Sequence, residues 1–324
     1  MIPIRDTQPS NRFPVITYTV IGINTVVFFL QIQIGFDNEV FFFSFGLVPA
    51  KYTVYELSRH FTVLNQLVSA FTYMFLHAGF IHFLGNMWTL YIFGDNVEEY
   101  FGSLRFLGFY LIFGLVSGLF HFLLNPVSMI PTIGASGGVA GVMGAYCVLF
   151  PRSRILTVIP ILIIPFFIEI PAFVFLGVWF LFQFLNAAGS GAGAGIAWWA
   201  HIGGFIAGLV MVHLNKKLPQ TGTSQKLHQY TVRRKTPRLQ MIVTKSKPES
   251  PDLFGDIDIS SLEALTGTKK TVTIPWGFYK PLYRVAIPSG VKQGTRLRLS
   301  GMGKSMPDGT KGDLYLRVNI KNAI

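Results

Sequence analysis

Two residues that could carry out chemistry lie inside long apolar stretches of the chain. Ser136 follows Gly134 in a Gly-Ala-Ser-Gly run, and His201 precedes a pair of glycines in a second stretch. Polar side chains inside a bilayer are costly, so those that occur there usually serve a function. A serine becomes a nucleophile when a neighbouring base takes its proton. The sequence therefore predicts that Ser136 is a nucleophile and that His201 is its base.

Depth in the membrane is the first reason for pairing these residues. Ser136 lies sixteen residues before Arg152, and His201 lies sixteen residues before Lys217. His82 lies equally far before the acidic end of its own apolar stretch. At about 1.5 Å per residue, each is roughly 24 Å above the inner edge of a hydrocarbon core about 30 Å thick. The three side chains are therefore expected at one level, a little below the outer surface.

Small side chains indicate that the helices carrying the serine and the histidine approach closely. Ala140 and Gly144 follow the serine at intervals of four, and Gly204 and Gly208 follow the histidine on one helix face. Small residues let membrane helices pack backbone to backbone. The glycines alone would also fit simple packing, with the serine as a helix-interface hydroxyl. The matching depth of the histidine favours a reactive pair instead.

His82 and Asn86 are candidate hydrogen-bond donors for the same site. They are four residues apart, so they share one face of a helix. Acyl transfer needs donors aimed at the developing oxyanion, and the backbone N–H of Ser136, near a helix N-terminus, is a third candidate. His77 is predicted either to support the site or to be purely structural. Glu169 is the one remaining candidate for an orienting acid, so the sequence favours a Ser–His dyad over a triad.

The apolar stretches predict an all-α polytopic membrane protein, a six-helix bundle. A membrane-spanning helix needs roughly 20 apolar residues. The six predicted spans are 15–34, 82–100, 104–124, 134–150, 170–187 and 198–214. Residues 155–170 are also apolar, but Pro160, Pro165 and Pro171 interrupt them, so a re-entrant or interfacial connection is expected. Lys and Arg in the short loops favour the side that holds both termini by seven to two, which predicts cytoplasmic termini.

The ordered set of motifs resembles the rhomboid family of intramembrane serine proteases. The resemblance runs from about residue 14 to residue 215. The motifs that carry it are Phe71–His77, His82 with Asn86, Phe93–Glu98, Gly134–Gly137, Trp179–Gln183 and Ala200–Gly204. A Gly-Ala-Ser-Gly run alone would be weak evidence, whereas the whole set in this order is specific.

The resemblance implies a serine nucleophile, a histidine base and an oxyanion hole lined by polar side chains. The residues in these positions are Ser136, His201, His82 and Asn86, with His77 and Gly134 in support. It also implies that the substrates are transmembrane protein segments, which enter sideways from the lipid bilayer and are cut near their outer ends. Some members carry an aromatic residue four positions after the serine that stacks on the catalytic histidine. Here that residue is Ala140, so another group must orient this histidine.

Beyond about residue 216 the chain changes from apolar to basic. Up to Asn215 there are 7 Lys and Arg against 8 Asp and Glu (7 − 8 = −1), and the rest has 20 against 7 (20 − 7 = +13). Residues 218–254 are expected to form a basic flexible linker that could lie on anionic lipid head groups. Nucleic-acid binding is not expected, because no aromatic residues interleave with the basic ones.

Residues 255–324 predict a small all-β soluble domain. Alternating segments separated by glycines are expected to form strands at 271–275, 283–288, 296–299 and 314–318. The stretches Leu262–Gly267, Ile287–Val291, Gly294–Leu299 and Gly312–Tyr315 resemble the C-terminal β-domain of DnaJ-type co-chaperones. The chain lacks the His-Pro-Asp signature and the cysteines of the zinc module. The resemblance therefore implies binding of a peptide or protein client, or association alone, rather than a full co-chaperone cycle.

These observations predict an intramembrane serine endopeptidase of a bacterial plasma (inner) membrane. Its predicted parts are a cytoplasmic segment 1–14, a six-span domain 15–217, the linker 218–254 and the β-domain 255–324. A catalytically silent rhomboid-like protein that binds membrane clients is the main alternative, although such proteins typically lose the serine or the histidine. A transporter is less favoured, because the ionisable residues form no midplane pathway. No cofactor or metal is expected, and the single Cys147 allows no intrachain disulfide.

Overall fold

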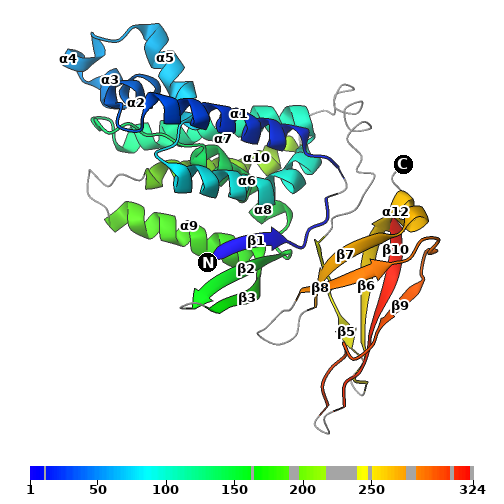
Figure 1. The fold of residues 1–324 in the computed structure, drawn as a ribbon. Helices are drawn as coiled ribbons and strands as arrows, with labels where there is room; N and C mark the ends of the chain where they lie inside the picture. The colour runs from blue at the N-terminus through cyan, green and yellow to red at the C-terminus, as the bar shows by residue number, and fades with distance from the viewer. Residues whose placement is uncertain are drawn as a thin grey trace. The chain divides into compact units, whose positions relative to one another are not determined.

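The chain forms two compact units, each with its own core (Figure 1). The structure is a computed structural model that describes residues 1–10, 12–161, 164–189, 197–216, 239–246, 250–274, 282–306 and 310–321. One unit, of residues 14–155 and 170–230, is helical. The other, of residues 1–13, 156–169 and 231–324, is rich in strands. Most of the predicted linker 218–254 lies outside the described residues.

All six predicted spans are helices, with ends within two residues of the predicted ones. They are α1 (Val15–Ile34), α6 (Phe80–Phe101), α7 (Ser103–Leu124), α8 (Ser136–Leu149), α9 (Ala172–Gly189) and α10 (Trp198–Asn215). Among the described residues, α1, α7 and α9 are each long and apolar enough to cross a membrane, and α8, with 14 residues, is shorter. A fourth span results if α6 is joined to the helical segment Val63–Phe75, which meets it at an angle of 76°.

The loop between α1 and α6 folds into short helices rather than an open chain. They are α2 (Glu39–Phe45), α3 (Ala50–Thr53), α4 (Tyr55–Ser58), α5 (Val63–Thr72) and the 3-10 helix η1 (Tyr73–Phe75). Lys51 is fully buried and donates hydrogen bonds to the carbonyls of Phe43 and Ser44 at the end of α2. A cation there satisfies carbonyls that lack partners within the helix. The loop therefore has a fixed structure beside the membrane domain.

Helix α8 packs with α10 at backbone contact distance. A Cβ built on Gly208 would overlap the carbonyl oxygen of Gly141, and one on Gly144 would overlap that of Phe205. This confirms the predicted close approach of the two helices, because only glycine leaves room for it. The contacting face of α8 also includes Gly137, which meets Gly204 of α10.

Glu98 fixes the opposite end of the bundle. Its buried carboxylate accepts hydrogen bonds from the backbone N–H groups of Ile16 (3.0 Å) and Thr17 (2.8 Å), and from the hydroxyl of Ser103 (2.6 Å). Pro14, the N-cap of α1, offers no capping side chain, so a carboxylate from another helix satisfies the free N–H groups. Three helices are joined at this point.

Within residues 155–170, the described residues belong to two paired strands, which the sequence patterns did not predict. The strands β1 (Ile2–Asp6), β2 (Arg154–Ile161) and β3 (Ile164–Pro171) pair in the order β1-β2-β3. The prolines, interpreted as breaks in a re-entrant segment, lie close to the ends of β2 and β3, where a missing N–H is tolerated. The residues that flank the two strands are also joined, since the N–H of Ala172, just after β3, donates to the carbonyl of Ser153, just before β2 (2.8 Å). The N-terminal segment 1–14 therefore contributes a strand.

The C-terminal β-domain is built from two sheets. One has the order β5-β6-β10-β9 and the other β4-β7-β8. The strands are β4 (Leu239–Met241), β5 (Lys245–Ser246), β6 (Leu253–Ser260), β7 (Thr268–Thr273), β8 (Leu282–Ile287), β9 (Arg296–Leu299) and β10 (Leu314–Lys321), and helix α12 (Ser261–Thr266) follows β6. The four predicted strands correspond to β7–β10. Their inward apolar residues, such as Val272, Val285 and Val318, form the core with Ile257 of β6.

A buried ion pair joins α12 to β7. Lys270 and Glu263 bond to each other, with side chains 0% and 5% exposed, and Glu263 also completes the capping box of α12 with Ser260. Breaking a buried pair leaves one charge uncompensated, which typically costs about 3–5 kcal/mol. We expect Glu263→Gln to destabilise the β-domain by about that amount, measured by hydrogen exchange of its amides in the full chain. Adding Lys270→Met should recover most of the loss, and no recovery would contradict the role of the pair.

Candidate active site

Ser136 and His201 meet across the contact between α8 and α10. Ser136 is the first residue of α8, and His201 lies in the first turn of α10. The Nε2 atom of His201 is 2.8 Å from the Oγ atom of Ser136. Both side chains are half-buried. The structure thus brings together the two residues that the sequence analysis paired, at the distance that proton transfer between them requires.

Gln183 of α9 is the residue that sequence reasoning missed. Its Oε1 atom lies 2.8 Å from the Nδ1 atom of His201. The indole rings of Trp179 and Trp198 lie 6.1 Å and 6.2 Å from the imidazole, centre to centre. Gln183, Trp179 and Trp198 therefore contact the imidazole of His201, whereas Ala140 has no ring that could stack on it. The sequence signal that could have identified Gln183 is a polar side chain within an apolar helix.

His82 faces the serine with a defined tautomer. Its Nδ1 atom accepts a hydrogen bond from the backbone N–H of Ala78 (3.3 Å), so the proton of the neutral ring is on Nε2. A Cβ built on Gly134 would lie 2.9 Å and 3.0 Å from the Cε1 and Nε2 atoms of this ring and 3.3 Å from the serine Oγ. The Nε2 atom of His82 and the Oγ atom of Ser136 thus both lie close to Gly134, and the Nε2–H group is a candidate donor at the serine.

Gly134 is required at its position for two reasons. Its φ angle is +138°, which side chains rarely adopt, and a Cβ would collide with the His82 ring. We expect Gly134→Ala to lower the rate of any reaction at Ser136 by about 10-fold or more, because the displaced ring can no longer donate correctly. The strained φ should also lower stability by about 1–3 kcal/mol, so rates are compared at a temperature at which thermal unfolding shows that the variant is folded. Full activity in the variant would show that the approach of His82 is not needed.

His77 and Asn86 flank His82 in the sequence. Asn86 is 8% exposed, and its Nδ2 atom has no hydrogen-bond partner among the described residues. His77 is fully buried, its ring centre is 5.3 Å from that of His82, and its backbone N–H and C=O both bond to the side chain of Gln31. Asn86 thus offers a free donor. The ring nitrogens of His77 also lack partners among the described residues, and its ring packs edge-on against that of His82.

The described residues provide no acid for His201 and no evident metal site. Glu169, the candidate orienting acid, lies in β3, and Gln183 occupies the Nδ1 atom that such an acid would bind. Within the described ranges, no group of three His, Cys, Asp or Glu side chains is arranged to hold a metal ion. The chemistry of the site is thus that of a hydroxyl, an imidazole and neutral hydrogen-bond donors.

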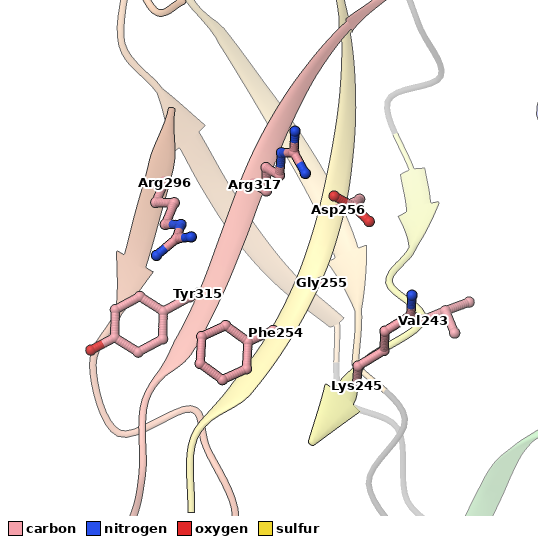
Figure 2. A pocket seen from close by; sticks show the side chains of 8 residues that line it. All are labelled: Val243, Lys245, Phe254, Gly255, Asp256, Arg296, Tyr315 and Arg317. Atoms are coloured by element: carbon pink, nitrogen blue, oxygen red, sulfur yellow. The ribbon is translucent and has the colours of Figure 1, made fainter. Parts of the chain in front are cut away.

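A second candidate site is a hollow on the four-stranded sheet of the β-domain (Figure 2). The rings of Phe254 and Tyr315 stack there, with centres 5.5 Å apart. Figure 2 shows Arg296 and Arg317 beside these rings, and Lys245 also lines the hollow. These three cations form no ion pair among the described residues. Asp256, the register partner of Arg317, also lines the hollow, which thus combines an aromatic pair with three cations and one carboxylate.

Arg298 of β9 already has a charged partner, so it is not available to bind a ligand in the hollow. It pairs with Asp313 (2.6 Å), the residue before β10. The backbone N–H of Gly301 and the guanidinium of Arg298 hold the pKa of Asp313 below its usual range.

The volume of the hollow, about 180 Å³, is less than that of typical cofactor pockets, roughly 300–1,000 Å³. It could take one side chain of a larger partner.

Comparison with known proteins identifies two domains. The Rhomboid domain family matches residues 64–217, and the DnaJ C terminal domain family matches residues 253–323. The chain therefore carries a rhomboid domain followed by a DnaJ C-terminal domain, and it is a multi-pass membrane protein.

Individual relatives agree with this assignment. The chain is 30% identical over 202 residues to Rhomboid protease GluP of Bacillus subtilis, a match that covers 61% of this chain and 34% of that protein. It is 27% identical over 214 residues to Rhomboid protein 1, mitochondrial, of Saccharomyces cerevisiae, covering 63% and 53%. A stretch of 42 residues is 48% identical to Chaperone protein DnaJ of Aliarcobacter butzleri, covering 13% and 11%. The chain thus spans about a third to a half of the rhomboid relatives.

Proposed function

We propose that this protein is an intramembrane serine endopeptidase that uses Ser136 and His201 as a catalytic dyad. The observation that carries the proposal is the 2.8 Å contact between the serine Oγ and the histidine Nε2, made by residues of separate helices. A hydroxyl and an imidazole at this distance form the nucleophile and base of acyl transfer. The similarity to rhomboid proteases supports the same chemistry.

The reaction proceeds in two halves. Ser136 Oγ attacks the carbonyl carbon of the scissile peptide bond while His201 Nε2 takes the hydroxyl proton, and a tetrahedral oxyanion forms. When the C–N bond breaks, the imidazolium returns this proton to the leaving amine. His201 then takes a proton from a water molecule, which attacks the acyl-serine ester. Collapse of the second intermediate releases the new carboxyl end and restores the Ser136 hydroxyl.

Three donors are proposed to stabilise the oxyanion. They are the Nε2–H of His82, the Nδ2 of Asn86 and the backbone N–H of Ser136. The N–H of Ser136 belongs to the first turn of α8, so it has no acceptor within the helix. Each such donor is typically worth about 2.7–4 kcal/mol of transition-state stabilisation. The unpartnered amide of Asn86 supports this role, because a buried donor without an acceptor is costly unless a ligand uses it.

The substrates proposed are transmembrane segments of other proteins. The distribution of Lys and Arg favours cytoplasmic termini, so Ser136, at the opposite end of α8 from Arg152, is near the outer surface. A segment entering from the bilayer would be cut near its outer end. We propose the plasma membrane of a bacterium as the location.

Reconstitution with a transmembrane substrate tests the proposal. We expect the purified chain in liposomes to cut a single-span substrate with small residues near the outer end of its span. Mass spectrometry of the products should locate the cut there. Binding of the substrate without any cut, over a panel of such spans, would favour the alternative of a catalytically silent membrane-client binding protein.

We further propose that the β-domain binds peptide or unfolded segments of client proteins. The stacked Phe254–Tyr315 pair offers an apolar surface. The cations that line the hollow, Lys245, Arg296 and Arg317, outnumber its one carboxylate, Asp256. This combination fits an acidic segment that carries an aromatic side chain. The DnaJ C-terminal domain supports client binding in general.

A charge reversal at the hollow tests client binding. We expect Arg317→Glu in the full chain to weaken binding of an acidic, aromatic-containing peptide by about 10-fold or more, measured by fluorescence anisotropy. The matched control is Arg284→Glu, since Arg284 is an exposed arginine of the other sheet and its reversal should change binding less than about 2-fold. Equal effects of both variants, or no binding by wild type, would leave association as the role of the domain.

A further inference from the structure

Both polar atoms of the Gln183 side-chain amide have hydrogen-bond partners. Gln183 is 4% exposed, and its Oε1 atom is 2.8 Å from His201 Nδ1. Its Nε2 atom donates to the carbonyl oxygen of Trp179, one turn earlier in α9, at 3.4 Å. An amide nitrogen can only donate and a carbonyl oxygen can only accept. This arrangement therefore places the amide oxygen, and not the nitrogen, toward the imidazole.

The direction of this amide determines the tautomer of His201. Because Oε1 can only accept, the Nδ1 atom must carry the hydrogen. In the neutral ring the Nε2 atom then has a free lone pair, and it is this atom that lies 2.8 Å from Ser136 Oγ. The opposite tautomer would place two lone pairs against each other at Gln183 and would leave no base for the serine. The amide thus selects the reactive form of the histidine.

We propose that Gln183 is a positioning residue that holds His201 in the Nδ1–H tautomer with Nε2 directed at Ser136. The inference rests on the proposed function. Gln183 occupies the place that an acid has in a catalytic triad, but as a neutral acceptor. It orients the ring without adding a negative charge beside the imidazolium that forms during the reaction. The rings of Trp179 and Trp198 restrict the remaining rotation of the imidazole.

Three variants of the full chain in liposomes test this role. Gln183→Leu should lower kcat by about 100-fold with KM changed less than about 2-fold, since the ring loses its preferred tautomer while substrate contacts remain. Gln183→Glu keeps the acceptor and should retain at least about a third of the wild-type kcat. Asn186→Leu is the matched control and should stay within about 2-fold of wild type, because Asn186 is another amide of α9 that donates to the carbonyl four residues earlier.

Rescue by the acidic variant separates positioning from packing. Gln183→Glu and Gln183→Leu fill similar space, but only the glutamate side chain keeps an oxygen that can accept the hydrogen on Nδ1 of His201. Packing alone would predict a similar kcat in the two variants. Wild-type kcat in Gln183→Leu, or a Gln183→Glu variant as inactive as Gln183→Leu, would overturn the inference.

A measurement that does not depend on cleavage distinguishes the two proposals. Nitrogen-15 NMR of labelled histidine, assigned with His201→Asn, reports which ring nitrogen carries the proton. Wild type should show the Nδ1–H form, and Gln183→Leu should show a mixture. A protein with this result but no cleavage of any substrate would reject the proposed function and retain the role of Gln183. A wild-type ring protonated on Nε2 would reject the role of Gln183 itself.

Discussion

Replacing Ser136 by alanine should lower the cleavage rate of a transmembrane substrate by about 10⁴-fold or more. The variant loses the only atom that can form the acyl intermediate, whereas the donors at His82 and Asn86 remain. Members of a catalytic unit act together, so the expected loss in His201→Ala is of the same order and the double variant is hardly slower than either. Initial rates in liposomes, with product detected by mass spectrometry, measure the effect.

Thr89→Val is a suitable control for this prediction. The Thr89 hydroxyl bonds to the carbonyl of Gly85 within its own helix (2.7 Å), so its removal deletes a hydroxyl from a membrane helix without touching the dyad. The control should keep its rate within about 2-fold. A Ser136→Ala variant that keeps more than a tenth of the wild-type rate would contradict the assignment of the nucleophile.

Gly208→Val should destabilise the helical unit by about 3 kcal/mol or more. The added side chain would overlap the carbonyl oxygen of Gly141, and neither backbone can move without separating α8 from α10. Because the same contact holds Ser136 against His201, the variant should also lose activity at temperatures at which it is still folded. Thermal unfolding in detergent and cleavage at a temperature below the transition measure the two effects.

Gly177→Val provides the matched control for helix packing. Gly177 is also a glycine within an apolar helix, α9, but a Cβ at this position meets no atom within 4 Å. The same substitution should therefore change stability by less than about 1 kcal/mol. Similar destabilisation in both variants would show that loss of glycine flexibility, rather than the contact between α8 and α10, decides stability.

The helices and the dyad could be predicted because strong local patterns encode them. Long apolar runs have few alternatives to a membrane helix, and the small residues around Gly204 and Gly208 indicated which faces meet. The equal predicted depth of Ser136 and His201 in the membrane then indicated that they form a pair. The same reasoning placed His82 near the serine, and the structure adds that Gly134 leaves room for its ring.

The three-stranded sheet and Gln183 depend on contacts that no local pattern reveals. Strand β1 pairs with β2, about 150 residues away in the sequence, and the apolar strands β2 and β3 have the composition of a buried segment. Prolines such as Pro165 were interpreted as breaks in a re-entrant segment, because a single sequence does not distinguish a proline at a strand end from one that interrupts a helix. Gln183 was visible as a polar residue in α9, but its direction toward His201 follows only from the packing of α9 against α10.

Covalent labelling of the serine is the most direct test of the dyad. The full chain in liposomes is treated with a fluorophosphonate, and the modified residue is located by mass spectrometry. We expect a single adduct on Ser136 Oγ, and we expect His201→Ala to abolish it, because an unactivated hydroxyl does not displace fluoride. No adduct on Ser136 in wild type, or equal labelling without His201, would contradict the proposal that these two side chains form a nucleophile and its base.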